Sequence, residues 1–310
     1  MQYQLQSNVI NAVSHKTVRI SKLERFSEIL ERIMSLFFTF CGFTAVAFVI
    51  LITVFLIISG TPAIAEIGPA DFLLGTKWAS TSSEPLYGIL PFILASIYGM
   101  AGAVILGVPV SILCSVFIVK KAGKILSPIV SSVVNLMSGI PSVVYGLVGM
   151  MVVVPSVRNI FSLPDGANLL SAVIVLAVMI IPSVISVSET AIRAVPPEYE
   201  EASLALGANM TETIFKVTLP AARSGILASV VLGTGRAIGE AMAVMMVSGN
   251  VPNMPGIFKS VRFLTTAVAS EMSYSSGLQR EALFSVALVL FCFIMMINII
   301  LNLVVKREKK

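Results

Sequence analysis

"AVPPEYEEASLALGANMTETIFKVTLPAARSG", residues 194–225, is the most organised polar segment of an otherwise apolar chain. Pro196 and Pro197 can occupy first-turn helix positions, where a missing N–H is harmless, and the glutamates that follow favour the positive end of a helix dipole. A left-handed turn at Gly207 can end this helix, and Asn209, with a glutamate three residues later, predicts a capping box that starts a second one. We therefore expect two short helices joined by a tight turn, a compact element suited to docking a partner. An ordinary helical loop is the alternative.

The composition around this segment is that of a membrane protein. Of the 310 residues, 56% are hydrophobic and 12% are charged, whereas soluble domains have about 45–50% apolar and about 25% charged residues. Long apolar runs predict six membrane spans of about 20 residues or more. They cover residues 34–59, 88–119, 125–155, 169–187, 222–247 and 282–305. We expect an all-α, polytopic transmembrane domain over 33–305, between polar tails at 1–32 and 306–310.

Basic residues set the expected orientation of the spans. Lysine and arginine are frequent in both tails, and three lysines lie between residues 120 and 124. The positive-inside rule then places both termini in the cytoplasm. The net charge of +5 is interpreted as this topology signal, and no nucleic-acid partner is expected.

Sequence signatures of enzymes and of metal sites do not occur in the chain. It contains no GxxxxGK[ST] phosphate loop, no HExxH and no GxSxG. Cys41, Cys114 and Cys292 lie in three different apolar runs, without the close spacing of a disulfide or a thiolate metal site, and are interpreted as core residues. We expect no catalytic residues, no metal and no cofactor.

Two longer loops, 60–87 and 248–281, are expected on the external side. The first holds the only tryptophan, Trp78, which is predicted to be an anchor at the level of the lipid headgroups. In the second, "SVRFLTTAVASEM" (260–272) predicts a short helix. Arg262 is the functional candidate in this loop, and a solvated loop charge is the alternative.

"GTGRAIGEAMAVMMV", residues 233–247, carries Arg236 and Glu240 inside an apolar run. A charge at the centre of a bilayer costs about 2.5–3.5 kcal/mol, so two such charges need a compensating interaction. Four residues apart on a continuous helix, the two side chains would lie on one face and pair directly. Gly235 and Gly239 form a GxxxG spacing, which predicts close helix packing.

The polar segment at 194–225 resembles the EAA loop of ABC importer permeases, whose pattern is E-A-A-x3-G-x9-I-x-L-P. Ser203 and Val217 replace the second alanine and the isoleucine of the pattern. The resemblance implies the MetI-like permease fold, a coupling loop over 196–220 that docks on a separate ATP-hydrolysing subunit, and no nucleotide site in this chain. The residues that keep the register of the pattern are Glu201, Ala202, Gly207, Leu219 and Pro220.

Three further stretches are similar to the phosphate-specific importer permeases, and in particular to the PstC-type subunit of the pair. They are "SGIPSVVYGLVGM" (138–150), "GTGRAIGEAMAVMMVSGN" (233–250) and "LTTAVASEM" (264–272), and the resemblance extends from about residue 72 to the C-terminus. Ala241 departs from it, since a threonine is usual there. The resemblance implies a homologous sibling permease, two cytoplasmic ATP-binding subunits and an extracytoplasmic phosphate-binding protein, in the inner membrane of a prokaryote.

On this resemblance Arg236 and Glu240 are expected to line the phosphate path, with Arg262 as a weaker candidate. The planar guanidinium of arginine can hold a tetrahedral oxyanion by two parallel hydrogen bonds. A structural ion pair is the alternative for the two intramembrane charges. A permease for another oxyanion such as sulfate or molybdate, and a membrane scaffold or sensor of phosphate status, are the alternative functions. A secondary transporter is less favoured, because the sequence has no visible inverted repeat.

Overall fold

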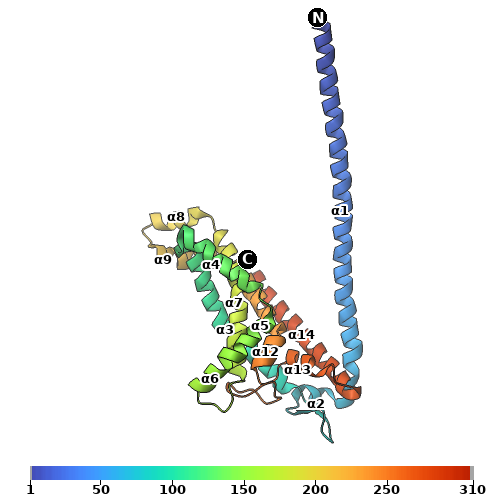
Figure 1. Ribbon diagram of the computed structural model, residues 1–310, viewed down its shortest axis with the longest axis vertical. Coiled ribbons are helices and arrows are strands. Elements are labelled where there is room, and N and C mark those ends of the chain that lie inside the picture. Colours follow the sequence, from blue (N-terminus) through green and yellow to red (C-terminus); the bar gives the residue numbers. More distant parts are fainter. Residues whose placement is uncertain (1, 308–310) are drawn as a thin grey trace. The chain divides into compact units, whose positions relative to one another are not determined.

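The computed structural model describes the backbone of residues 2–307 and the side chains of residue 27 and residues 29–303 (Figure 1). By their internal contacts the residues form two units, 1–57 and 58–310, which are described separately. Most basic side chains of the expected tails, 1–32 and 306–310, lie outside the described side chains.

Helices make up nearly all of the regular structure, and two short strands pair as an antiparallel hairpin. The segments labelled η are π-helical turns, which sit within or at the ends of longer helices. In chain order the elements are α1 (Gln2–Ile67), α2 (Pro69–Leu74), β1 (Trp78–Ala79), β2 (Leu86–Tyr87), α3 (Leu90–Val116), η1 (Phe117–Lys121), α4 (Gly123–Ser138), α5 (Ser142–Val148), η2 (Gly149–Val153), α6 (Val154–Ile160), α7 (Leu169–Arg193), α8 (Pro197–Ala205), α9 (Met210–Thr213), η3 (Ile214–Thr218), α10 (Leu219–Ala221), α11 (Arg223–Gly239), α12 (Met242–Val247), α13 (Leu264–Glu271) and α14 (Gly277–Arg307).

Among the described residues, five helices are long and apolar enough to cross a membrane, and a bent pair raises the number to as many as six. The pair consists of Met210–Ala221 and Arg223–Gly239, which meet at an angle of 71°. Each of these regions overlaps one of the six predicted runs, so the expected all-α polytopic fold is confirmed. The five single spans are Ile29–Ile67, Leu90–Lys121, Ser142–Ile160, Leu169–Arg193 and Gly277–Leu303.

Helix α7 is the centre of the second unit, with α3 and α11 packed against it (Figure 1). Small and hydroxyl-bearing residues at these contacts let the helix backbones come close. Ser115 Oγ donates to a main-chain carbonyl of α7 at 3.2 Å, and the Ser188 and Ser229 hydroxyls lie 2.8 Å apart between α7 and α11. A Cβ added at Gly233 of α11 would lie 2.6 Å from Val184 Cγ2, so only glycine fits there without a shift.

The two glycines of the GxxxG spacing do not make this contact. Among the described residues, nothing lies within 4 Å of the place where a Cβ would stand at Gly235 or Gly239. Leu232, three residues before Gly235 on the helix, is 53% exposed. The predicted close packing of these glycines is therefore wrong within this chain, and Gly233 has that role instead.

The predicted third span, 125–155, is two helices rather than one. Helix α4 ends at Ser138, and α5 begins at Ser142 after Pro141, whose ring cannot donate a main-chain hydrogen bond. The Met137 carbonyl accepts from Ile140 N at 3.2 Å and from Tyr145 Oη at 2.8 Å, so the Tyr145 hydroxyl of α5 links the two helices across the break. The span that follows the break runs further than predicted, to Ile160.

The predicted external loop 60–87 is mostly ordered secondary structure. Helix α1 continues through Pro62 to Ile67, and the hairpin that follows packs on α3. Trp78 is only 6% exposed, and its ring lies 5.4 Å from those of Tyr87 and Phe92. The prediction that Trp78 anchors the chain at the lipid headgroups is wrong, because the ring belongs to the core beneath the hairpin. The short helix predicted in 260–272 is confirmed as α13.

The three cysteines are free. Cys114 of α3 packs against residues of α4 and α7, whereas Cys41 and Cys292 are exposed. Only Cys114 therefore meets the expectation of a core position. The two exposed cysteines lie on helix surfaces that lipid can solvate.

The contact at Gly233 predicts a destabilised variant. Gly233→Val places its side chain against Val184, and such overpacking should cost about 1–3 kcal/mol of folding free energy. The thermal unfolding temperature of the detergent-purified chain should fall accordingly. Gly235→Val is the matched control, because it carries the same change of helix propensity with open space around the new side chain. An equal loss of stability in both variants would contradict the contact.

Candidate functional site

The predicted fifth span, 222–247, is broken next to its two charged residues, Arg236 and Glu240. Helix α11 ends at Gly239, Glu240 has an extended backbone with φ −76° and ψ 126°, and α12 begins at Met242. Glu240 Oε1 accepts a hydrogen bond from Ala243 N at 3.0 Å, and so satisfies one of the free N–H groups in the first turn of α12. The prediction of a continuous helix over 222–247 is wrong, because the glutamate side chain caps a new helix instead.

Arg236 has a neutral partner. Its Nη1 donates to Ser183 Oγ of α7 at 2.9 Å, and the side chain is half-buried. Among the described residues, no carboxylate lies within 4.0 Å of the Arg236 guanidinium. The predicted Arg236–Glu240 ion pair is wrong, because the break in the helix removes the one-turn register and directs the carboxylate to α12.

The Arg236 guanidinium consequently keeps hydrogen-bonding capacity near the end of α11, inside an apolar run. It has five N–H donors, of which the Ser183 hydroxyl takes one. A permanent cation without a carboxylate partner is costly inside a membrane, and such residues usually mark an ion or substrate pathway. The arrangement suits an anion that binds and leaves.

Arg262 belongs to a different cluster. Its Nε donates to the Asn250 carbonyl at 3.0 Å, its Nη1 pairs with Glu271 Oε1, and its Cζ lies 5.9 Å from the centroid of the Phe92 ring. The side chain is 13% exposed, so the alternative of a solvated loop charge is wrong. Because Glu271 compensates its charge, Arg262 is a weaker candidate than Arg236 for contact with an anion.

Helix α13 connects this cluster to the break. Thr265 Oγ1 donates to the main-chain carbonyl of Glu240 at 2.9 Å and so holds the extended residue in place. At the other end of α13, Glu271 accepts hydrogen bonds from Trp78 Nε1 and Gln279 Nε2, both at 3.3 Å. The conformation at Glu240 is thus tied to the hairpin and to the start of α14.

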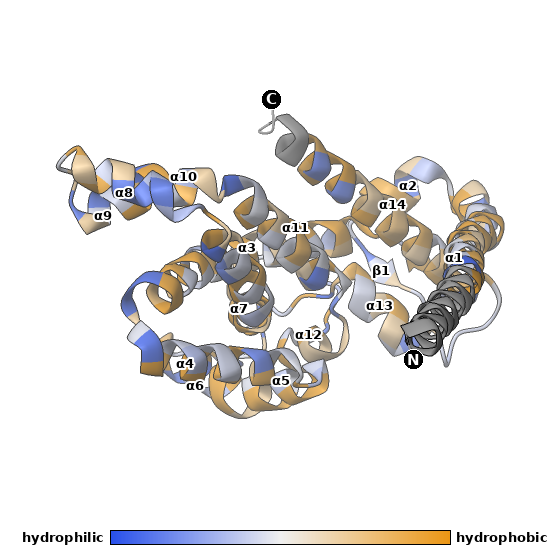
Figure 2. Cartoon of the chain, turned by 90° about the horizontal axis from the view of Figure 1, so that it is seen from above, coloured by the Kyte–Doolittle hydropathy of each residue, from blue (hydrophilic) through white to orange (hydrophobic). Residues whose placement is uncertain are grey.

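The loop between α7 and α11 folds as the sequence predicts. Helix α8 begins directly after Pro196, and Gly207 has a left-handed φ of 89°. Asn209 Oδ1 accepts from Glu212 N at 2.9 Å, and Asn209 N donates to Glu212 Oε2 at 3.1 Å, which confirms the capping box. Figure 2 shows hydrophilic residues along α8, in contrast to the largely hydrophobic α14.

Glu200 ties α8 to the end of the second span. Its Oε1 lies 2.5 Å from Lys120 Nζ and accepts from Thr218 Oγ1 at 2.7 Å. Burial acts to raise the pKa of the Glu200 carboxyl, but the hydrogen bonds from Lys120 and Thr218 outweigh burial and hold the pKa below its ordinary value. This contact was missed from the sequence, since nothing in the sequence pairs residues eighty positions apart.

The residues of the EAA pattern divide into exposed and packed positions. Leu219 packs with Ile192 and Ile214 beneath the loop, whereas the other four positions are exposed. Leu206, beside the glycine turn, is 90% exposed. Exposed apolar and polar residues on one compact protrusion are what a docking element requires. The four exposed positions are Glu201, Ala202, Gly207 and Pro220.

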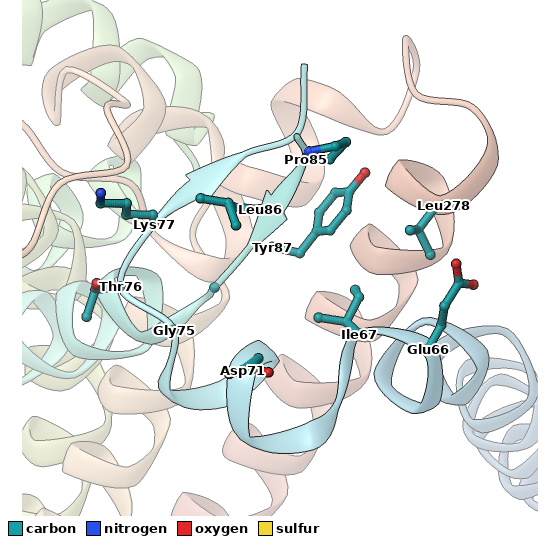
Figure 3. Close-up of a pocket in the computed structure, with 11 residues that line it drawn as sticks. Glu66, Ile67, Asp71, Gly75, Thr76, Lys77, Pro85, Leu86, Tyr87 and Leu278 are labelled. Atoms are coloured by element: carbon teal, nitrogen blue, oxygen red, sulfur yellow. The ribbon is translucent and has the colours of Figure 1, made fainter. Parts of the chain in front are cut away.

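A cavity of 510 Å³ lies beside the hairpin (Figure 3). The carboxylates of Glu66 and Asp71 line it, together with Lys77 and the ring of Tyr87. Burial, and then the nearby Glu66 carboxylate, raise the pKa of Tyr87. Two carboxylates line the cavity and the Lys77 side chain extends away from them (Figure 3), so the cavity is a poorer candidate for an anion site than the surroundings of Arg236.

Comparisons with known proteins identify the family of the chain. Residues 107–310 match a family described as "Binding-protein-dependent transport system inner membrane component". The "Probable ABC transporter permease protein YqgH" of Bacillus subtilis (strain 168) is 34% identical over 296 residues, covering 93% of this chain and 95% of that protein. The "Phosphate transport system permease protein PstC" of Haemophilus influenzae is 31% identical over 290 residues, covering 86% and 91%.

A solved structure supports the fold alone. A chain of the MetNI methionine ABC transporter in an inward-facing conformation is similar with a TM-score of 0.53 and 21% identity, covering 72% of this chain and 95% of that chain. The MetI-like permease fold expected from the EAA loop is confirmed.

The ion pair between Glu200 and Lys120 predicts that the attachment of α8 depends on pH. Because the folded state lowers the carboxyl pKa, the ion pair is fully present at neutral pH and is lost as the pH falls through and below the ordinary range of glutamate. Glu200→Gln should therefore loosen α8 at neutral pH, where the wild-type loop is intact. We expect roughly fivefold faster amide hydrogen exchange in residues 197–205, as for a partly exposed ion pair worth about 1 kcal/mol.

Lys216→Gln is the control for this measurement, because its pair with Glu212 lies on the same loop at 3.6 Å but is much more exposed. Exchange at the wild-type rate in Glu200→Gln would mean that the ion pair contributes nothing to the position of α8.

Proposed function

The chain belongs to the family of binding-protein-dependent transport system inner membrane components, and we propose that it forms, with a homologous sibling permease, the transmembrane path of an ATP-driven phosphate importer. The observation that carries the proposal is the half-buried Arg236, whose only hydrogen-bond partner among the described residues is the Ser183 hydroxyl. Relatives named as phosphate transport permeases support phosphate as the anion.

In the proposed path, phosphate oxygens take the N–H donors of Arg236 that Ser183 leaves free. The planar guanidinium presents parallel donors that match two oxygens of a tetrahedral oxyanion. Breaking a hydrogen bond between the guanidinium and a neutral hydroxyl costs less than breaking an ion pair with a carboxylate. Ser183 can therefore hold Arg236 when no phosphate is bound without competing strongly with phosphate. Glu240 acts on the path through the backbone, by capping α12 and by presenting its carbonyl to Thr265.

The loop 196–220 is proposed to be the coupling element. Its exposed positions, Glu201, Ala202, Gly207 and Pro220, would meet one of two cytoplasmic ATP-binding subunits, which would carry out the hydrolysis. The end of the second unit at which this loop lies is then cytoplasmic, as are both termini. The hairpin end would receive phosphate from an extracytoplasmic binding protein.

Transport by the assembled complex tests the proposal. In vesicles that carry this chain with its sibling permease and ATP-binding subunits, phosphate uptake should require ATP and the binding protein. Arsenate should compete, because it shares the geometry and charge of phosphate, whereas sulfate should not. Equal competition by sulfate would indicate a general oxyanion permease, and intact phosphate signalling without any uptake would indicate a sensor.

Substitutions at the break separate the roles of its two charged residues. Arg236→Gln should lower uptake by about tenfold to a hundredfold, as for the loss of charge-assisted hydrogen bonds. Membrane insertion and subunit assembly should stay normal, because a neutral side chain removes the insertion cost. Wild-type uptake by Arg236→Gln would exclude the proposed contact.

Glu240→Gln is the matched change. The glutamine carbonyl oxygen can still accept from Ala243 N, so uptake should stay within a few-fold of wild type, whereas Glu240→Ala should lose the cap and much of the uptake. Equal loss in Glu240→Gln and Glu240→Ala would show that the charge itself is required.

A further inference from the structure

A second group of polar side chains lines a groove at the loop end of the second unit. The groove has a volume of 650 Å³ and lies between η1 and α4 on one side and α7 on the other. Its lining includes neither Arg236 nor Ser183, so none of its residues is part of the proposed path. Its polar lining consists of Lys120, Lys124, Ser127, Ser131, Glu189 and Arg193.

The centre of the groove is a carboxylate surrounded by donors. The Ser131 hydroxyl lies 3.0 and 3.1 Å from the two oxygens of Glu189, and Arg193 donates to Glu189 Oε1 from Nε at 3.0 Å and from Nη2 at 2.8 Å. Arg193 Nη2 also donates to Ser127 Oγ at 3.0 Å. Each pair is four residues apart on its helix, so two serines of α4 face the glutamate and the arginine of α7.

The charges of the groove favour an anion. Three cationic side chains and one carboxylate line it, and Glu200 compensates Lys120 from outside the lining, which leaves a net charge of +1. Lys124 is exposed, and among the described residues it has no carboxylate within 4.0 Å. A guanidinium, an ammonium and two hydroxyls together match the several oxygens of a phosphate group better than the two of a carboxylate. A metal cation would be repelled by the same lining.

We propose that this groove binds a phosphate group, either inorganic phosphate or the headgroup of an anionic phospholipid, and that Glu189 limits the affinity by occupying the same donors. The inference rests on the lining of the groove and is independent of the transport proposed for Arg236.

The groove is also connected to the coupling loop. Lys120, which contributes to the lining, holds Glu200 of α8 at 2.5 Å. A phosphate group in the groove shares this ammonium with Glu200. Occupancy of the groove therefore changes the attachment of α8, and phosphate at this end can regulate the loop.

Equilibrium dialysis with radiolabelled inorganic phosphate tests the first source of the ligand. The full chain is purified in detergent with Arg236→Gln in every sample, so that the proposed path does not contribute. Lys124→Gln in this background should weaken binding roughly fivefold. Glu189→Gln should strengthen it, because the amide no longer competes as an anion for Ser131 and Arg193. Lys216→Gln removes a charge from the same end outside the groove and should leave the affinity unchanged.

Native mass spectrometry tests the second source. The same variants, purified from membranes that contain phosphatidylglycerol and phosphatidylcholine, should retain less phosphatidylglycerol in Lys124→Gln than in Lys216→Gln if the headgroup is the ligand. Weaker binding in Lys124→Gln in either experiment supports phosphate binding in the groove and shows whether the ligand is inorganic phosphate or a lipid headgroup. If Lys124→Gln and Lys216→Gln behave alike in both experiments, the proposal is overturned. Failure of ATP-driven uptake would leave these binding results in place, so the two proposals fail separately.

Discussion

Every main-chain polar group inside a bilayer must be satisfied by the protein, because no water is present to do so. This constraint explains where the helices of this chain are able to break. At the end of α4, the Met137 carbonyl accepts from Ile140 N and from the Tyr145 hydroxyl, and at Glu240 the side chain caps Ala243 N while the Thr265 hydroxyl donates to the main-chain carbonyl. At each break, a side-chain hydroxyl or carboxylate forms hydrogen bonds with the main chain.

The second break gives the charged stretch its character. On a continuous helix Arg236 and Glu240 would neutralise each other, whereas the break assigns the carboxylate to a helix end and leaves the guanidinium with a hydroxyl. The partner of the extended backbone comes from α13, which the cluster around Glu271 anchors to the hairpin. The conformation at Glu240 therefore depends on packing at the hairpin end of the domain. Helix α13 connects the cluster around Glu271 to Glu240, four residues from Arg236.

The loop end is organised by paired charges. Lys120 fixes α8 through Glu200, and Arg193 with Glu189 fixes α4 through Ser127 and Ser131. The Lys120–Glu200 pair is largely shielded from water, whereas the Arg193 side chain is 49% exposed, and anions can compete with the carboxylates for both cations. The loop 196–220, proposed as the coupling element, and the groove proposed to bind a phosphate group share Lys120, which would connect the two.

The amino-acid sequence by itself determined the features that depend on neighbours within a few residues. Apolar runs long enough to cross a bilayer gave about six spans, and the capping box of Asn209 with the left-handed turn at Gly207 followed from residues three positions or fewer apart. The EAA spacing likewise identified the family and the fold. Tertiary structure alone decided where helices break and which charges pair. The Arg236–Glu240 pair was predicted from helical spacing, but a hydroxyl 25 residues further along the chain stabilises the extended backbone that separates them. Lys120 meets Glu200, and Gly233 rather than Gly235 meets α7, because helix packing sets the rotation and depth of each helix, and no local pattern carries that information.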